Sequence, residues 1–83
     1  SGPRVHLASL RLADDAVATW RALQGRHPDV LAGLGLALAR LDLGEGVGVF
    51  YQVQAGPFAD AAAARAACDV LHGRGQFCQP VAP

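Results

Sequence analysis

Lysine and methionine are missing from the chain, and aromatic residues make up only 6% of it. The seven basic residues are therefore all arginines, and seven acidic residues balance them to a formal net charge of zero. Binding to a phosphate backbone needs a concentrated basic surface, so this balance argues against a nucleic-acid partner. No apolar run approaches the ~18 residues of a membrane span, and no signal-peptide pattern is present. We expect any export signal or membrane anchor to lie outside these residues.

The length of the chain, 83 residues, suits one small domain. A chain of this size buries only ~60–65% of its unfolded surface, so its core is thin and a covalent cross-link would matter. The hydrophobic share of 52% supports a packed core. We expect residues 1–3 to be a tag or linker remnant and residues 4–83 to form a single domain.

Four short segments have strand patterns and two longer segments have helical periodicity. In the first strand, Val5 and Leu7 lie on one face while His6 and Ala8 lie on the other. The second strand alternates imperfectly, which either a bulge or a partly apolar open face would explain. The predicted strands are residues 4–10, 36–43, 49–55 and 76–81.

Acidic residues mark the starts of both predicted helices. Asp14 and Asp15 supply the cap and first-turn charge of the first helix, and Asp60 caps the second. Trp20 lies on the apolar stripe of the first helix, so we expect it in the core and not at a ligand. The apolar stripe of the second helix consists of Ala64, Ala67, Cys68 and Leu71.

This order of elements predicts an α+β, ferredoxin-like βαββαβ fold. In that fold four antiparallel strands form one sheet, both helices cover one of its faces, and the other face stays open. We expect a ligand to bind the open face. No nucleophile, base and orienting group occur together, and the glycines of residues 44–48 lack the following lysine and helix of a phosphate-binding loop. We therefore expect neither catalysis nor a cofactor.

Five stretches carry a family resemblance: residues 5–9, 26–28, 40–44, 50–60 and 73–78. The most specific is the run Val-Gln-Ala-Gly-Pro-Phe at residues 53–58, which a capped, alanine-rich helix follows. In this order and spacing the stretches resemble SPOR domains, the sporulation-related repeat of cell-envelope and division proteins. The resemblance covers nearly the whole chain.

The resemblance implies a non-catalytic, periplasmic module that binds glycan strands of peptidoglycan lacking stem peptides, enriched at the division septum. We expect a monomer with no nucleic-acid partner and no direct membrane contact. The family's strand-one glutamine and serine fall on His6 and Ser9, its strand-three aromatic falls on Phe50, and a last-strand aromatic falls near Phe77. His6 replaces the usual glutamine, and Leu10 stands where an aromatic is common.

Aromatic rings among polar groups suit sugars, which have apolar C–H faces and hydroxyl edges. If Cys68 and Cys78 face each other, strand alternation puts Phe77 on the open face. Arg40 would lie beside this surface and is a candidate partner for the lactyl carboxylate of muramic acid. The candidate glycan-binding residues are His6, Ser9, Arg40, Phe50, Gln52, Gln54 and Phe77.

Cys68 and Cys78 are the only cysteines of the chain. In an exported module we expect them to form a disulfide, and the alternative is two buried free thiols. Two thiolates fall short of the four ligands of a structural zinc site, so we expect no metal. Two other functions share the fold: an RRM-like module for single-stranded RNA and an ACT-like domain that binds a small regulatory molecule.

Overall fold

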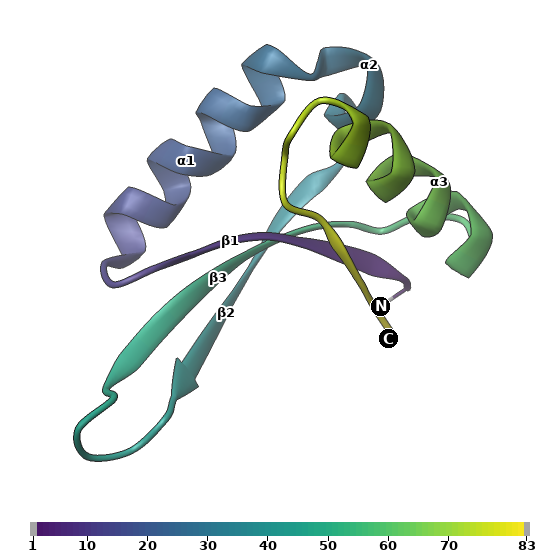
Figure 1. Ribbon diagram of the computed structural model, residues 1–83. Helices are drawn as coiled ribbons and strands as arrows, with labels where there is room; N and C mark the ends of the chain where they lie inside the picture. The colour runs from purple at the N-terminus through teal and green to yellow at the C-terminus, as the bar shows by residue number, and fades with distance from the viewer. Residues whose placement is uncertain (1, 83) are drawn as a thin grey trace.

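A four-stranded antiparallel sheet, with the strand order β2-β3-β1-β4, forms one layer, and the helices form the other (Figure 1). The computed structural model describes residues 2–82. This arrangement confirms the expected ferredoxin-like α+β fold, with the short helix α2 added to the two expected helices. The elements are β1 (Arg4–Leu10), α1 (Ala13–Arg26), α2 (Pro28–Leu31), β2 (Gly35–Asp42), β3 (Val49–Gly56), α3 (Ala61–Gly73) and β4 (Gln79–Val81).

One sequence expectation concerns the ends of the chain. Ser1 and Pro83 lie outside the described residues, so the assignment of residues 1–3 to a tag or linker and of residues 4–83 to the domain stays a prediction. Pro3 does contact the fold, because its carbonyl oxygen accepts a hydrogen bond from the Phe58 backbone N–H at 2.8 Å.

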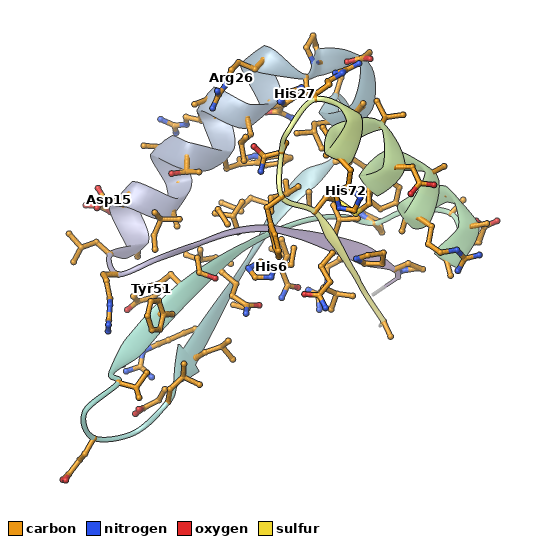
Figure 2. The ribbon with its side chains drawn as sticks, viewed as in Figure 1. His6, Asp15, Arg26, His27, Tyr51 and His72 are labelled. Atoms are coloured by element: carbon orange, nitrogen blue, oxygen red, sulfur yellow. A yellow bond between two sulfur atoms is a disulfide. The ribbon has the colours of Figure 1, made fainter. Side chains whose placement is uncertain are left out.

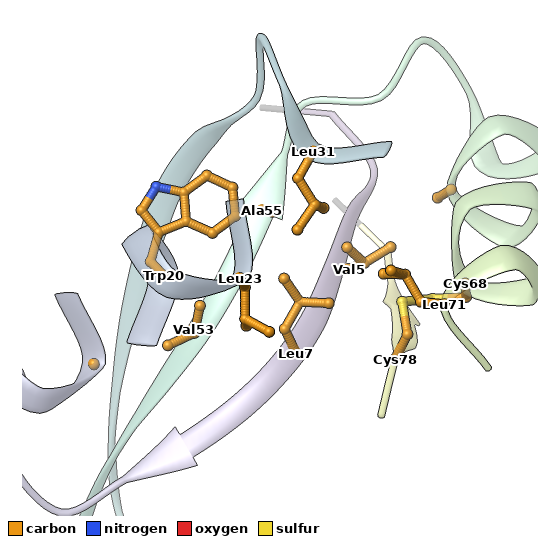
Figure 3. Packing of buried hydrophobic residues seen from close by; sticks show 12 residues of the cluster. Val5, Leu7, Trp20, Leu23, Leu31, Val53, Ala55, Cys68, Leu71 and Cys78 are labelled. Carbon is orange, nitrogen blue, oxygen red and sulfur yellow. A yellow bond between two sulfur atoms is a disulfide. The ribbon is translucent and has the colours of Figure 1, made fainter. Parts of the chain in front are cut away.

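The core lies between the sheet and the helices (Figure 3). Trp20 of α1 is 7% exposed, which confirms its expected place in the core. The predicted apolar stripe of α3 is buried along its whole length. The buried cluster comprises Val5, Leu7, Ala16, Trp20, Leu23, Leu31, Val53, Ala55, Ala64, Cys68, Leu71 and Cys78.

β1 contains an irregularity that decides which of its side chains face away from the helices. The register with β3 breaks between His6, which pairs with Gln54, and Ala8, which pairs with Val53. The extra residue, Leu7, is buried, and Ala8 packs against the same core. The expectation that Ala8 shares a face with His6 is therefore wrong, because the bulge turns two consecutive residues toward the helices.

β2 pairs with β3 along its whole length without a break in register, so a bulge does not explain its imperfect alternation. Leu38 pairs with buried Val53, and Arg40 pairs with half-buried Tyr51. Because paired residues share a face, Leu38 and Arg40 both lie on the helix side. The β2–β3 hairpin extends past the helices, so this side meets solvent toward the hairpin (Figure 1). The polar residues on the helix side of β2 therefore lie where the helices no longer cover the sheet.

The two long helices begin differently. The Oδ1 atom of Asp60 accepts a hydrogen bond from the backbone N–H of Ala63 at 2.8 Å, which confirms the cap of α3. In α1 the cap position is Leu12, which makes no side-chain capping bond. The expected cap at Asp14 is wrong, because the helix begins at residue 13 and both aspartates fall within its first turn. There their charge still favours the helix dipole.

Cys68 and Cys78 form a disulfide that joins α3 to the segment before β4. The expected disulfide is therefore present, and both cysteines are buried. β4 is shorter than predicted, because residues 76–78 have no regular pairing. A hydrogen bond of 2.7 Å between His72 Nε2 and the Cys78 carbonyl oxygen adds a second link between helix and segment.

Candidate functional site on the open sheet face

One row of side chains from each strand points away from the helices. Side chains alternate along a strand and paired residues share a face, so the buried residues and the registers assign these rows. We call this surface the open face. It comprises Arg4, His6, Ser9 and Arg11 in and just after β1, Ala37, Ala39 and Leu41 of β2, Phe50, Gln52 and Gln54 of β3, and Phe77 and Gln79 beside and in β4.

His6 lies on the side of β1 away from the helices (Figure 2). Its Nε2 atom is 3.0 Å from the Ala8 carbonyl oxygen and 3.0 Å from the Ser9 Oγ atom. Strict alternation would put His6 and Ser9 on opposite faces, and the bulge at Leu7 brings them to the same one. The spacing of the family's strand-one motif thus depends on an irregular strand.

The closeness of Ser9 and His6 does not make a catalytic pair. A carbonyl oxygen only accepts hydrogen bonds, so the contact with Ala8 requires the proton to be on His6 Nε2. That nitrogen then cannot take a proton from the Ser9 hydroxyl, as a general base must. Within residues 2–82, no carboxylate hydrogen-bonds to the imidazole to orient it.

Phe77 lies beside His6, as the alternation argument predicted. The two rings meet edge to face, with centroids 5.3 Å apart and an interplanar angle of 77°. The side chain of Phe77 is 54% exposed. Gln76 holds this segment against β1, because its Nε2 atom donates to the Leu7 carbonyl oxygen at 3.1 Å and to the Phe77 carbonyl oxygen at 2.9 Å.

Phe50 lies under a cation. The Cζ atom of Arg11 is 4.0 Å from the centroid of the Phe50 ring, well within cation–π range. Arg11 Nη1 also donates to the carbonyl oxygen of Val47 in the hairpin loop. The sequence pattern did not single out Arg11, because it follows the predicted strand and reaches the open face only through the bulge.

Gln52 and Gln54 form a linked pair of amides. The Nε2 atom of Gln54 donates to Gln52 Oε1 at 3.0 Å. Gln54 is only 6% exposed, so it is far less accessible than an open-face residue was expected to be. Its Oε1 atom has no donor among residues 2–82. A buried acceptor of this kind costs about 1–3 kcal/mol when it stays unpaired.

Arg40 does not lie on the open face. Its pairing with Tyr51 puts it on the helix side, so its expected place beside the glutamines is wrong. Arg4 occupies the open face instead, one alternation step before His6. A Cβ atom at Gly56 would lie 2.8 Å from Arg4 Cγ, so the arginine stem rests directly on the backbone of β3. Regular alternation predicts this placement, although Arg4 was not singled out.

Leu10 departs from the family pattern without changing the open face. It pairs with Tyr51 and packs against the core on the helix side. An aromatic ring at this position would therefore contact the core and not a ligand on the open face.

Within residues 2–82, no three side chains of the metal-binding types gather closely enough to hold a metal ion. None of the helices in that part of the chain has both the length and the apolar character to cross a membrane. The open face offers aromatic rings, amides, a hydroxyl and cations, which are groups that suit the binding of a polar ligand.

No curated protein and no solved structure matches the chain significantly. The family model of the SPOR domain matches residues 1–82, which is essentially the whole chain. SPOR domains are binding modules associated with the cell envelope and with division. By this match the chain belongs to the SPOR domain family, whose members are known to bind peptidoglycan.

Proposed function

We propose that this domain is a non-catalytic module that binds glycan strands lacking stem peptides on its open face. In this proposal it acts as a periplasmic monomer and brings its parent protein to the division septum. Family membership supports peptidoglycan as the ligand. The observation that carries the choice of surface is the exposed ring of Phe77 next to a row of linked polar groups.

The polar row suits a sugar chain. Ser9, Gln52 and His6 can exchange hydrogen bonds with hydroxyl groups, since each carries a donor, an acceptor or both. Gln54 Oε1 offers one buried acceptor for a hydroxyl or an acetamido N–H. The ring of Phe77 can pack on the C–H face of a pyranose. Phe50 would add a second ring where Arg11 leaves it accessible.

Selection for strands without stem peptides would follow from steric exclusion at the open face. A peptide attached to muramic acid would occupy the space between the sugar ring and the open face or collide with the strands. The domain would then favour glycan that amidases have stripped, which accumulates where the wall is divided.

Sedimentation with purified sacculi tests the proposal. Amidase-treated sacculi should retain the domain, and untreated sacculi should retain much less of it. Phe77→Ala should abolish retention, whereas Val70→Ala, which changes an exposed apolar residue of α3, should not. Equal retention on both sacculi would refute the selectivity, and retention of Phe77→Ala would refute the surface.

Single-stranded RNA serves as the competing ligand in the same assay. Binding of RNA in preference to sacculi would replace the proposal by the RNA-binding alternative. An exported fluorescent fusion should also collect at constriction sites of dividing cells, and an even distribution along the envelope would contradict septal targeting.

A further inference from the structure

Charge is divided unevenly between the faces of this neutral domain. The seven acidic residues lie in or next to the helices, in the β2–β3 loop, or on the helix side of β2, and none occupies an open-face position of a strand. The open face carries Arg4 and Arg11. It is therefore cationic, although the whole chain is not. The acidic residues are Asp14, Asp15, Asp29, Asp42, Glu45, Asp60 and Asp69.

Arg4 and Arg11 lie at the two ends of the β1 row. They are seven positions apart, which corresponds to ~23 Å at the rise of ~3.3 Å per strand residue. Neither arginine forms an ion pair within residues 2–82. A ligand that follows β1 would pass the first arginine, the polar row and then the second arginine.

A hollow of about 170 Å³ lies beside Arg4. Gly35 and Gly56, which pair with each other across β2 and β3, contribute no side chains to it. Since a water molecule takes about 30 Å³ in the liquid, the hollow has room for a short side arm of a sugar. The Nε atom of Arg4 is buried and has no partner among residues 2–82. Gln54, with its unpaired buried acceptor, is the next open-face residue along β3 from Gly56.

We propose that Arg4 and Arg11 each bind a lactyl carboxylate of one glycan strand, so that the open face selects an anionic glycan over a neutral aminosugar polymer. This inference rests on the proposed glycan-binding function and deepens it. A guanidinium holds a carboxylate with two parallel hydrogen bonds, and Arg11 keeps further N–H donors beside the one that Val47 accepts. A strand with a single lactyl group can engage only one of the two arginines.

The same contact supplies a second reason to reject intact peptidoglycan. A stem peptide is joined to the lactyl group through an amide bond, so the carboxylate that the arginines would bind no longer exists at that sugar. Selection against peptides is then electrostatic as well as steric.

Calorimetric titration with two oligosaccharides of equal length tests this inference. One is the peptide-free alternating glycan with lactyl carboxylates, and the other is a chito-oligosaccharide without them. The wild type should bind the first about 10- to 100-fold more tightly, since one or two charge-assisted contacts separate the ligands. Its affinity for the first should fall with rising salt. Arg4→Gln with Arg11→Gln should remove both effects, and Arg21→Gln with Arg65→Gln, at exposed helix positions, should leave them intact.

The outcomes separate the two proposals. Equal, salt-independent binding of both oligosaccharides would overturn the carboxylate contacts and leave glycan binding in place. Binding of neither would overturn the proposed function itself. Phe77→Ala should lower the affinity for both oligosaccharides alike, whereas the arginine variants should lower the affinity only for the anionic one.

Arg4 packs on the backbone of β3, so thermal melting of each variant must accompany the titrations. Arg11 is exposed, so Arg11→Gln tests the carboxylate contact without disturbing the packing on β3. This single substitution should lower the preference for the anionic glycan about 10-fold. An unchanged preference in this variant would overturn the role of Arg11.

Discussion

The ring of Phe77 stands edge-on to the imidazole of His6, with centroids 5.3 Å apart. The two residues come from opposite ends of the chain, and Phe77 lies in a segment without regular strand pairing. Four links hold that segment in place: the disulfide of Cys78, the hydrogen bond between His72 and the Cys78 carbonyl oxygen, the hydrogen bond from Gln76 to the β1 bulge, and the ring contact itself. The most exposed ring of the open face is thus positioned by cross-links and not by the sheet.

Removal of the disulfide should reduce both stability and binding. In the chain-entropy account, a bridge that closes a loop of this length contributes about 2–3 kcal/mol, and its ends are 10 residues apart. Urea denaturation of Cys68→Ser with Cys78→Ser should show a loss of that size in the free energy of unfolding. Under conditions where the variant is still folded, its affinity for glycan should also fall, because Phe77 is less well fixed. Unchanged affinity would mean that Gln76 and His6 suffice to hold the ring.

Gln54→Leu should separate stability from function. Leucine is an apolar residue of roughly similar size, and it removes a buried acceptor that has no partner within residues 2–82. We expect the melting temperature to stay the same or rise, while glycan affinity falls about 5- to 10-fold with the lost hydrogen bond. Gln52→Leu is the matched control, because it removes the acceptor that Gln54 now uses. A fall in stability as large as that in Gln52→Leu would contradict this account.

Local sequence patterns predicted most of the fold, but they predicted only some of the residues that form the open face. The alternation of β1 and the cap at Asp60 depend on neighbours in sequence, and both were confirmed apart from the bulge. The pairing with Tyr51 puts Arg40 on the helix side, and its exposure there depends on how far the helices reach over the hairpin, which no local pattern records. Arg11 reaches the open face only because Leu7 is an extra residue in the ladder. The charge division between the faces is likewise a property of the folded chain.

The Asp29–Arg74 ion pair should stabilise the folded domain at neutral pH, and this contribution should be lost at acid pH. Arg74 donates two hydrogen bonds to the Asp29 carboxylate and holds the pKa of that carboxyl below its usual range. Since the folded pKa is depressed, the contribution is present above the pKa of the unfolded state and is lost as pH falls through the folded pKa. Melting temperatures of the wild type and Asp29→Asn should differ at pH 7 and converge as the pH falls through the depressed pKa of the folded state.

The control for that pair is Asp69→Asn, at an exposed residue of α3 that forms no ion pair within residues 2–82. Its melting temperature should follow the wild type at every pH. A constant gap between Asp29→Asn and the wild type down to pH 2 would show that the charge of Asp29 is not the source of the effect. Because both partners are exposed, raised salt should narrow the gap at pH 7.

Leu10→Phe tests the face assignment of β1 directly, because it restores the aromatic residue that is common in the family. If residue 10 faced the ligand, the added ring would raise glycan affinity. The structure pairs Leu10 with Tyr51 and packs it against the core, so the larger side chain should overfill that side. We expect a loss of about 1–3 kcal/mol in the free energy of unfolding and no gain in affinity. A tighter complex would place residue 10 on the open face, which is incompatible with the bulge at Leu7.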